Sequence, residues 1–188
     1  MLQTIFELNI WNMDLSLDLD QLKKEINTII KSDKGRVISN QGGYQSHDVE
    51  IKKFTHLKFL KEVIVNNTIQ YKQSLGLKIE SDLLNLWINV NDFKDFNTSH
   101  THPGGIISGV FYVSCTDKCG NIVFENSGKD MIESAWSSKV NIYNQNTSPK
   151  WRIKPSNNKL LLFPSFLSHY VEPNLSEDKR ISISFNML

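Results

Sequence analysis

Three histidines and one arginine are the residues in this sequence whose types and order could do chemistry. His100 and His102 alternate in the stretch NTSHTHPGG, and side chains at alternate positions of an extended segment point to the same side. His169 lies far downstream in LLLFPSFLSHYVEPN, and Arg180 follows it in KRISISF. Neutral imidazole binds metals, and the planar guanidinium can bind a carboxylate through two parallel hydrogen bonds. We therefore predict a β-barrel pocket in which the histidines hold a metal and the arginine holds a carboxylate.

The residue types of this cluster leave the identity of the metal open. Three histidines with an open position are typical of catalytic zinc. Non-heme Fe(II) oxygenases usually use two histidines and one carboxylate. The position that carries the carboxylate in an H-x-D pattern is His102 in this chain, so ligand chemistry alone does not favour iron.

The composition excludes several function classes. The chain has 188 residues, enough for one sizeable core, and its 21 Lys and Arg against 20 Asp and Glu give a net charge of +1. This balance argues against bulk binding to nucleic acid, and no apolar run approaches the length of a membrane span. Cys115 and Cys119 are the only cysteines, which fits a reducing cytoplasm better than a disulfide scaffold. We expect a cytoplasmic protein, in the host cytoplasm if a phage encodes it, without nucleic-acid or membrane partners.

The first part of the chain carries the helical periodicity. Apolar residues recur at helical spacing over 16–32 and 54–75. Ser16 is the expected N-cap of the first helix, and Gly76 is the expected stop of the second. The other elements predicted in this part are a first strand over 2–11 and a loop over 33–48.

Short β-rich runs separated by turn residues begin after Ile79. Such a series fits a sandwich, a barrel or a double-sheet jelly roll. The predicted strands are 83–91, 106–114, 121–125, 139–143, 151–154, 159–164, 168–172 and 180–187. The segment 126–150 is the least regular and is expected to be a lid or an insertion. We predict a single domain with a helical part over about 1–80 and a barrel core over about 81–188.

Several aromatic and amide residues allow a structural or a functional interpretation. Asn89 and Asn91 alternate with Trp87 just before the paired histidines and could line a substrate mouth, although packing is the default role for the tryptophan. Trp136 and Trp151 are expected in the core. Two cysteines without a second pair indicate an ordinary turn more than a zinc site.

From Trp87 to the C-terminus the chain resembles the Fe(II)/2-oxoglutarate-dependent dioxygenases, above all the prolyl-4-hydroxylase-like branch and a set of phage and bacterial 2-oxoglutarate oxygenases. The matching pieces are HTHPGGIISGVFYV, GNIVFEN, KLLLFPSFLSHYVEPN and RISISF, with SNQGGYQS at 39–46 as an additional likeness. The resemblance implies a mainly β fold, a double-stranded β-helix of the jelly-roll or cupin-like kind with the N-terminal helices on one sheet. It also implies Fe(II) and 2-oxoglutarate as cofactor and co-substrate, with ascorbate as an optional reductant.

The resemblance assigns a carboxylate-binding role to the end of the chain. Arg180 would pair with the C5 carboxylate of 2-oxoglutarate. The hydroxyl of Ser182, or alternatively that of Ser184, would donate to the same carboxylate, and Tyr112 would also touch it. The arginine and the two serines share one face if their segment is a strand, so these polar groups can converge.

The resemblance also assigns the metal ligands. His100 and His169 would bind the iron. An aspartate would be expected at the position of His102, so this histidine is either the third ligand of a neutral triad or a bystander. In the second case water or a nearby acid such as Asp95 would complete the site.

The function implied by the resemblance is hydroxylation coupled to conversion of 2-oxoglutarate to succinate and CO2. The substrate would be a protein side chain, with peptidyl proline leading and a small metabolite as the runner-up. The alternative is a metal-binding jelly roll with a structural or accessory role and no oxygenase activity. A buried Arg180 beside Ser182, facing a metal, would favour the enzyme. A homodimer is left open.

Overall fold

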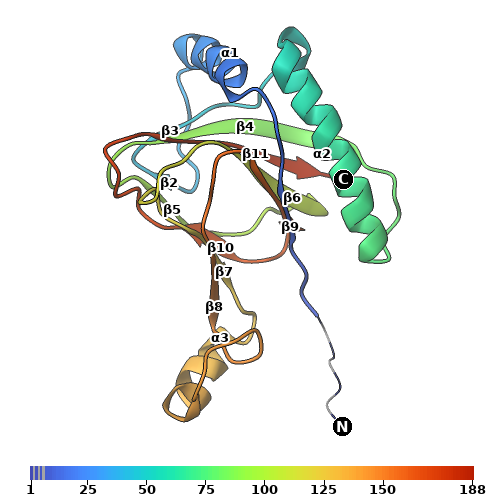
Figure 1. Cartoon of the computed structure of the whole chain (residues 1–188), viewed down its shortest axis with the longest axis vertical. Helices are drawn as coiled ribbons and strands as arrows, with labels where there is room; N and C mark the ends of the chain where they lie inside the picture. Colours follow the sequence, from blue (N-terminus) through green and yellow to red (C-terminus); the bar gives the residue numbers. More distant parts are fainter. Residues whose placement is uncertain (2, 4, 6) are drawn as a thin grey trace.

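The computed structural model describes every residue except Leu2, Thr4 and Phe6. Two antiparallel sheets face each other, as Figure 1 shows. The larger sheet has the strand order β1 (Trp11–Asp14), β9 (Lys159–Pro164), β6 (Ile107–Ser114), β11 (Arg180–Met187), β4 (Leu83–Asn91) and β3 (Tyr44–Gln45). The smaller sheet has the order β2 (Asn40–Gln41), β5 (Phe96–His100), β10 (His169–Val171), β7 (Ile122–Glu125) and β8 (Lys150–Ile153). The mainly β jelly-roll fold, a double-stranded β-helix, is confirmed.

The two faces of the larger sheet differ in chemistry because side chains alternate along each strand. In β11, Ile183 and Phe185 are fully buried in the main apolar core. Ser182 and Ser184, on the other face of the same strand, line a cavity between the two sheets. The sequence RISISF therefore places apolar groups toward the helices and polar groups inside the barrel.

The outer face of the larger sheet is covered by α1 (Leu19–Ser32) and α2 (Thr55–Ser74) (Figure 1). Leu22 and Ile26 of α1 and Leu60 of α2 are buried in the core that these helices share with the sheet. A short 3₁₀ turn, η1 (Ile51–Lys53), precedes α2. No helix in the described part of the chain is long and apolar enough to span a membrane.

The predicted end of α2 at Gly76 is confirmed, whereas the predicted N-cap of α1 is wrong. The N-cap of α1 is Asp18, whose carboxylate accepts hydrogen bonds from the backbone N–H groups of Asp20 and Gln21 at 3.1 Å each. The prediction of Ser16 as this cap is wrong because it lies too far before the first turn to reach those donors. Gly76 follows α2 with a φ of +71°, a conformation that glycine adopts without strain.

Two predicted strands need correction, and three short strands were not predicted. The predicted strand over 2–11 falls partly on Leu2, Thr4 and Phe6, which lie outside the described residues, and the described remainder becomes a strand only at Trp11. The segment 139–143 is an exposed 3₁₀ turn and loop, with Ile142 72% exposed. β5 was not predicted as a strand. The two-residue strands β2 and β3 also form inside the predicted loop 33–48.

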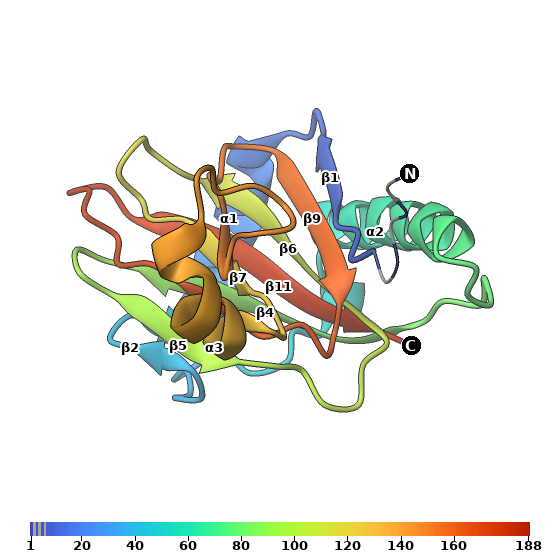
Figure 2. The ribbon, with the colours of Figure 1, turned by 90° about the horizontal axis from the view of Figure 1, so that it is seen from below.

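The segment 126–149 is an insertion between β7 and β8. It contains α3 (Lys129–Met131), a π-helical turn (η2, Ile132–Trp136) and a 3₁₀ turn (η3, Ser137–Lys139). In Figures 1 and 2 it projects from the smaller sheet, on the side away from α1 and α2. The core positions expected for Trp136 and Trp151 are wrong, since these side chains are 52% and 45% exposed.

Candidate metal centre

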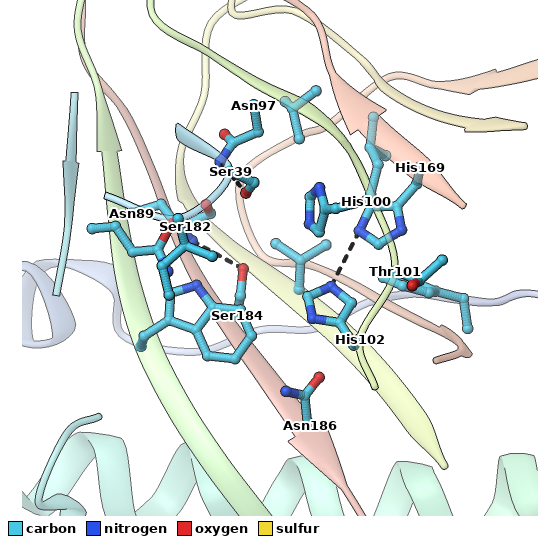
Figure 3. A pocket seen from close by; sticks show the side chains of 18 of the residues that line it. Ser39, Asn89, Asn97, His100, Thr101, His102, His169, Ser182, Ser184 and Asn186 are labelled. Atoms are coloured by element: carbon cyan, nitrogen blue, oxygen red, sulfur yellow. Dashed lines mark hydrogen bonds between the residues drawn. The ribbon is translucent and has the colours of Figure 1, made fainter. Parts of the chain in front are cut away.

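The three histidines converge at the edge of the cavity between the sheets. His100 at the end of β5 is the cross-strand partner of His169 at the start of β10. The backbone N–H of His102 donates to the Ser165 carbonyl at 2.9 Å, which holds this residue beside them. One ligand nitrogen from each ring lies within 4.8 Å of the other two, and the imidazoles lie together in Figure 3. The alternation in SHTH and the strand pairing together bring the predicted ligands into one cluster.

Hydrogen bonds fix how two of these rings are turned. The Nδ1 of His100 lies 2.7 Å from the Thr98 carbonyl, and the Nδ1 of His169 lies 2.9 Å from the Leu167 carbonyl. A carbonyl only accepts, so each Nδ1 carries the proton and each Nε2 keeps a free lone pair. Carbonyl groups that orient histidine rings in this way are a regular feature of metal sites.

The rings are held in their neutral form. Burial, and secondarily the neighbouring His100, lowers the pKa of His102 to about 4. The same causes lower the pKa of His169 to about 3, and burial lowers the pKa of His100. At neutral pH the cluster therefore presents lone pairs and carries no positive charge that would repel a cation.

The nitrogen positions fit a shared metal ion. His102 Nε2 lies 3.3 Å from His169 Nε2. Two imidazole nitrogens that each bind one tetrahedral ion at about 2.0–2.1 Å lie about 3.3 Å from each other. Asp95 is not part of this cluster: its carboxylate accepts from the Asp92 N–H at 2.7 Å in the turn before β5.

Arg180 is a buried cation with an unused donor. Its side chain is 1% exposed. Nη1 donates to the carbonyls of Cys119 and Glu172, the second at 3.1 Å, while Nη2 is buried without a partner among the described residues. No described acid forms an ion pair with it, and burial lowers its pKa. An uncompensated buried charge is costly, so this position fits an anion that brings its own oxygens.

Hydroxyl groups lie on the strands next to this guanidinium. Ser182 and Tyr112 are cross-strand partners on β11 and β6, both line the cavity, and neither hydroxyl hydrogen-bonds to a described residue. The Ser184 hydroxyl accepts from the Asn89 amide at 3.0 Å (Figure 3). The Ser184 O–H can still donate, but Ser182 lies nearer to Arg180 along β11 and is therefore better placed to donate to a carboxylate bound by the arginine.

The cavity measures about 280 Å³ and reaches from the histidines to Arg180. In Figure 3 the imidazoles lie across it from Ser182 and Ser184. The rest of its lining includes apolar residues and many amides, together with one further cation; its polar members and Trp87 are Arg36, Ser39, Gln45, Asn85, Trp87, Asn89, Asn91, Asn97, Thr101 and Asn186. Trp87, Asn89 and Asn91 line this cavity; that they form a substrate mouth stays a prediction.

One buried acid next to the metal cluster escaped the sequence analysis. Glu125 at the end of β7 is 7% exposed and hydrogen-bonds Ser99, Ser168 and Lys129. Burial opposes its ionisation, but these hydrogen bonds outweigh burial and lower its pKa to about 2. The available signal was a single acid that ends the apolar run IVF.

Comparisons with known proteins point in one direction. A family model described as "Putative 2OG-Fe(II) oxygenase" matches residues 85–186, more than half of the chain. No curated protein sequence matches. The non-heme alpha ketoglutarate dependent epimerase SnoN from nogalamycin biosynthesis superposes with a TM-score of 0.71 and 10% identity, over 96% of this chain and 78% of that one.

Two prolyl hydroxylases have similar structures. One, from Pseudomonas putida, is a prolyl-4-hydroxylase with a TM-score of 0.67 and 13% identity, over 95% of this chain and 92% of that one. The other, from Trichoplax adhaerens, is in complex with a hypoxia inducible factor oxygen degradation domain peptide; its TM-score is 0.69 at 13% identity, over 95% of this chain and 83% of that one. At these identities the likeness concerns the fold.

Proposed function

The chain belongs to the family of 2OG-Fe(II) oxygenases, and on this premise we propose that it hydroxylates a protein side chain, with peptidyl proline as the leading candidate. The reaction would convert 2-oxoglutarate and O2 to succinate and CO2 and place one oxygen atom on the substrate. The observation that carries the proposal is the buried Nη2 of Arg180, which has no hydrogen-bond partner among the described residues and lies in the same cavity as the three neutral histidines. A structural jelly roll has no use for such a group.

His100, His102 and His169 would hold the iron through their ring nitrogens. When bound, Fe(II) supplies the O2 chemistry that protein side chains lack. The Thr98 and Leu167 carbonyls keep the protons of His100 and His169 on Nδ1, so that the lone pair of each Nε2 would be free to bind the ion. Three neutral ligands leave the positive charge of the ion uncompensated, which favours an anionic co-substrate beside it.

Arg180 would bind the C5 carboxylate of 2-oxoglutarate with Nη2, while Nη1 stays on the carbonyls of Cys119 and Glu172. The Ser182 and Tyr112 hydroxyls line the same end of the cavity and would donate to that carboxylate. These groups bind and orient the co-substrate with its other end toward the histidines. Because the guanidinium is 1% exposed, water screens this attraction little.

Each of the two candidate substrate classes has its own support. The Trichoplax adhaerens neighbour is in complex with a peptide, which supports a protein substrate. The amide-rich lining and the second cation, Arg36, support a polar small metabolite as the runner-up, and the SnoN neighbour comes from the biosynthesis of nogalamycin. Incubation of the enzyme with proline-containing peptides or with metabolite mixtures, followed by mass spectrometry for the gain of one oxygen atom, separates the two classes.

The test of the proposed activity is succinate formation from 2-oxoglutarate after anaerobic loading with Fe(II), with Arg180→Ala as the variant. We expect wild-type turnover, and in the variant a loss of 2-oxoglutarate affinity with metal affinity retained. Removing one partner of a buried charge pair costs roughly 3–5 kcal/mol, which is about two to four decades in affinity. Calorimetric titration that shows equal 2-oxoglutarate affinity in both proteins would refute this role for the arginine.

A further inference from the structure

We propose that Glu125 is a positioning residue for the metal site. Its carboxylate ties together the two segments that carry His100 and His169 and anchors them to the first turn of the 126–149 insertion. The inference rests on the proposed role of these histidines as ligands. It concerns how firmly the protein holds them in place before any metal binds.

The carboxylate of Glu125 bridges the residues that precede the two ligands. Oε2 accepts hydrogen bonds from the Ser99 hydroxyl at 2.5 Å and from the Ser168 hydroxyl at 2.8 Å. The two hydroxyls lie 2.9 Å from each other. Ser99 directly precedes His100, and Ser168 directly precedes His169. One oxygen atom therefore fixes the spacing of both segments at a single point.

The backbone transmits this constraint to the rings. The Glu125 N–H donates to the Ser168 carbonyl at 2.9 Å, and β10 pairs with both β5 and β7. The ring of His100 is bonded to the Thr98 carbonyl and that of His169 to the Leu167 carbonyl. Each serine thus sits between a ligand and the carbonyl that orients it, so a shift of the serine would shift the ring.

The second oxygen links this bridge to the insertion. Oε1 accepts from the ammonium of Lys129 at 2.8 Å, and Lys129 begins α3. The carboxylate is 7% exposed, so Lys129 provides its counter-charge in a site with little water. The insertion therefore completes the bonding of Glu125 on the outer face of the smaller sheet, while the histidines point to the inner face.

A carboxylate has a specific advantage at this position. Its two oxygens accept three hydrogen bonds from two hydroxyls and one ammonium, and the amide of a glutamine can accept on one side only. Losing a residue that supports metal ligands typically weakens metal affinity by about ten- to a hundredfold. Glu125→Gln keeps the size of the side chain and removes this capacity.

The experiment titrates the metal-free protein with Co²⁺ alone, by calorimetry and by the visible absorption of the bound ion. We expect Glu125→Gln to bind Co²⁺ about ten- to a hundredfold more weakly, with an altered absorption spectrum. Glu25→Gln is the matched control, because Glu25 also accepts several hydrogen bonds in the folded protein but caps α2, outside the cavity lining. The control should lose stability and keep wild-type Co²⁺ affinity.

A double-mutant cycle tests the mechanism. If Glu125 acts through the serines, Ser99→Ala with Ser168→Ala should weaken Co²⁺ binding, and adding Glu125→Gln should weaken it little further. Should Glu125→Gln fail to fold, Ser168→Ala alone serves as the milder variant. Wild-type affinity and spectrum in a folded Glu125→Gln protein would overturn the proposal. Absence of Co²⁺ binding by the wild-type protein would instead overturn the ligand assignment in the proposed function.

Discussion

At the scale of single residues, His102 decides how this site differs from a two-histidine, one-carboxylate centre. Its backbone is fixed by the hydrogen bond to the Ser165 carbonyl, and its ring packs within 5.1 Å of the ring of His169, measured between centroids. The ring contacts of His102 also include Trp87 and Phe163. These contacts hold the imidazole beside the other two rings, so a substitution at His102 tests whether it is a ligand.

We predict that His102→Asp will retain or raise Fe(II)-dependent succinate formation. Aspartate restores the donor set that suits non-heme Fe(II) and adds a negative charge beside a divalent cation. The opposing effect is length, since a carboxylate on a shorter side chain must approach from a backbone placed for imidazole. The measurement is succinate release under O2 after anaerobic loading with Fe(II).

His102→Ala is the control for that variant. If the aspartate variant performs no better than the alanine variant while the wild type is active, the site requires three histidines. If all three proteins behave alike, His102 is not a ligand. The predicted result is therefore an aspartate variant that is at least as active as the wild type and clearly more active than the alanine variant.

Much of the site could be predicted from the sequence because the residue types and their spacing along the chain already indicate the chemistry. Histidine and arginine are uncommon in apolar, β-rich segments, so the HxH pair, the later histidine and the arginine stood out. The structure brings all four residues to one cavity. Glu125 could not be predicted in the same way. Its role depends on the hydroxyls of Ser99 and Ser168, which become neighbours only when β5, β10 and β7 pair.

At the scale of the secondary elements, α2 begins without a cap of its own. Phe54 occupies the N-cap position and has no side-chain oxygen. Glu25 of α1 supplies the missing acceptor: its carboxylate oxygens accept from the backbone N–H groups of His56 and Leu57 at 2.9 Å each. One helix therefore caps the other, which fixes their relative placement on the sheet.

We predict that Glu25→Gln lowers the free energy of unfolding by about 1–2 kcal/mol at neutral pH. Burial opposes ionisation of Glu25, but hydrogen bonds from His56 and Leu57 outweigh it and lower its pKa below 4.5. A lowered folded-state pKa means that this stabilisation is present above about pH 4.5 and is lost as the pH falls through the folded-state value. Chemical denaturation of both proteins across this range should show their difference shrinking on acidification; a constant difference would contradict the charged-cap explanation.

Element types were predictable where a periodic pattern matched a packed face. α1 and α2 have apolar residues at helical spacing, and β4 and β11 have alternating chemistry. The polar run FNTSH of β5 gave no such pattern, because its extended conformation comes from pairing with β2 and β10. The opposite error occurred at 139–143, where β-prone residues such as Val140 and Ile142 pair with no strand in the part of the chain that the structure describes.

At the scale of the whole molecule, the cavity lies between two sheets whose outer faces are covered differently. The helices α1 and α2 pack on the outer face of the larger sheet and share one apolar core with it. The smaller sheet carries the histidines and has the 126–149 insertion on its outer side (Figures 1 and 2). The insertion contributes little to the core: Ile132 is its one buried apolar side chain among the described residues. We therefore expect α1 and α2 to contribute much more than the insertion to the free energy of unfolding.

We predict that the barrel folds without the insertion. The Asn126 N–H donates to the Pro149 carbonyl at 2.9 Å, and Glu125 pairs with Lys150 in the β7–β8 ladder, so the ends of the insertion already lie side by side. Replacing residues 127–148 by Asn-Gly, a sequence that favours a two-residue hairpin turn, should keep cooperative thermal unfolding. The loss in stability should stay near the roughly 1.5–3 kcal/mol of one buried Ile side chain. Ile132→Ala in the full chain measures that contribution separately.

The deletion also removes Lys129 but leaves Ser99 and Ser168 hydrogen-bonded to Glu125, so Co²⁺ affinity should fall less than in Glu125→Gln. An unfolded deletion variant would show that the smaller sheet needs the insertion in order to fold. A folded deletion variant that binds Co²⁺ more weakly than Glu125→Gln would show that the insertion itself holds the histidines in place.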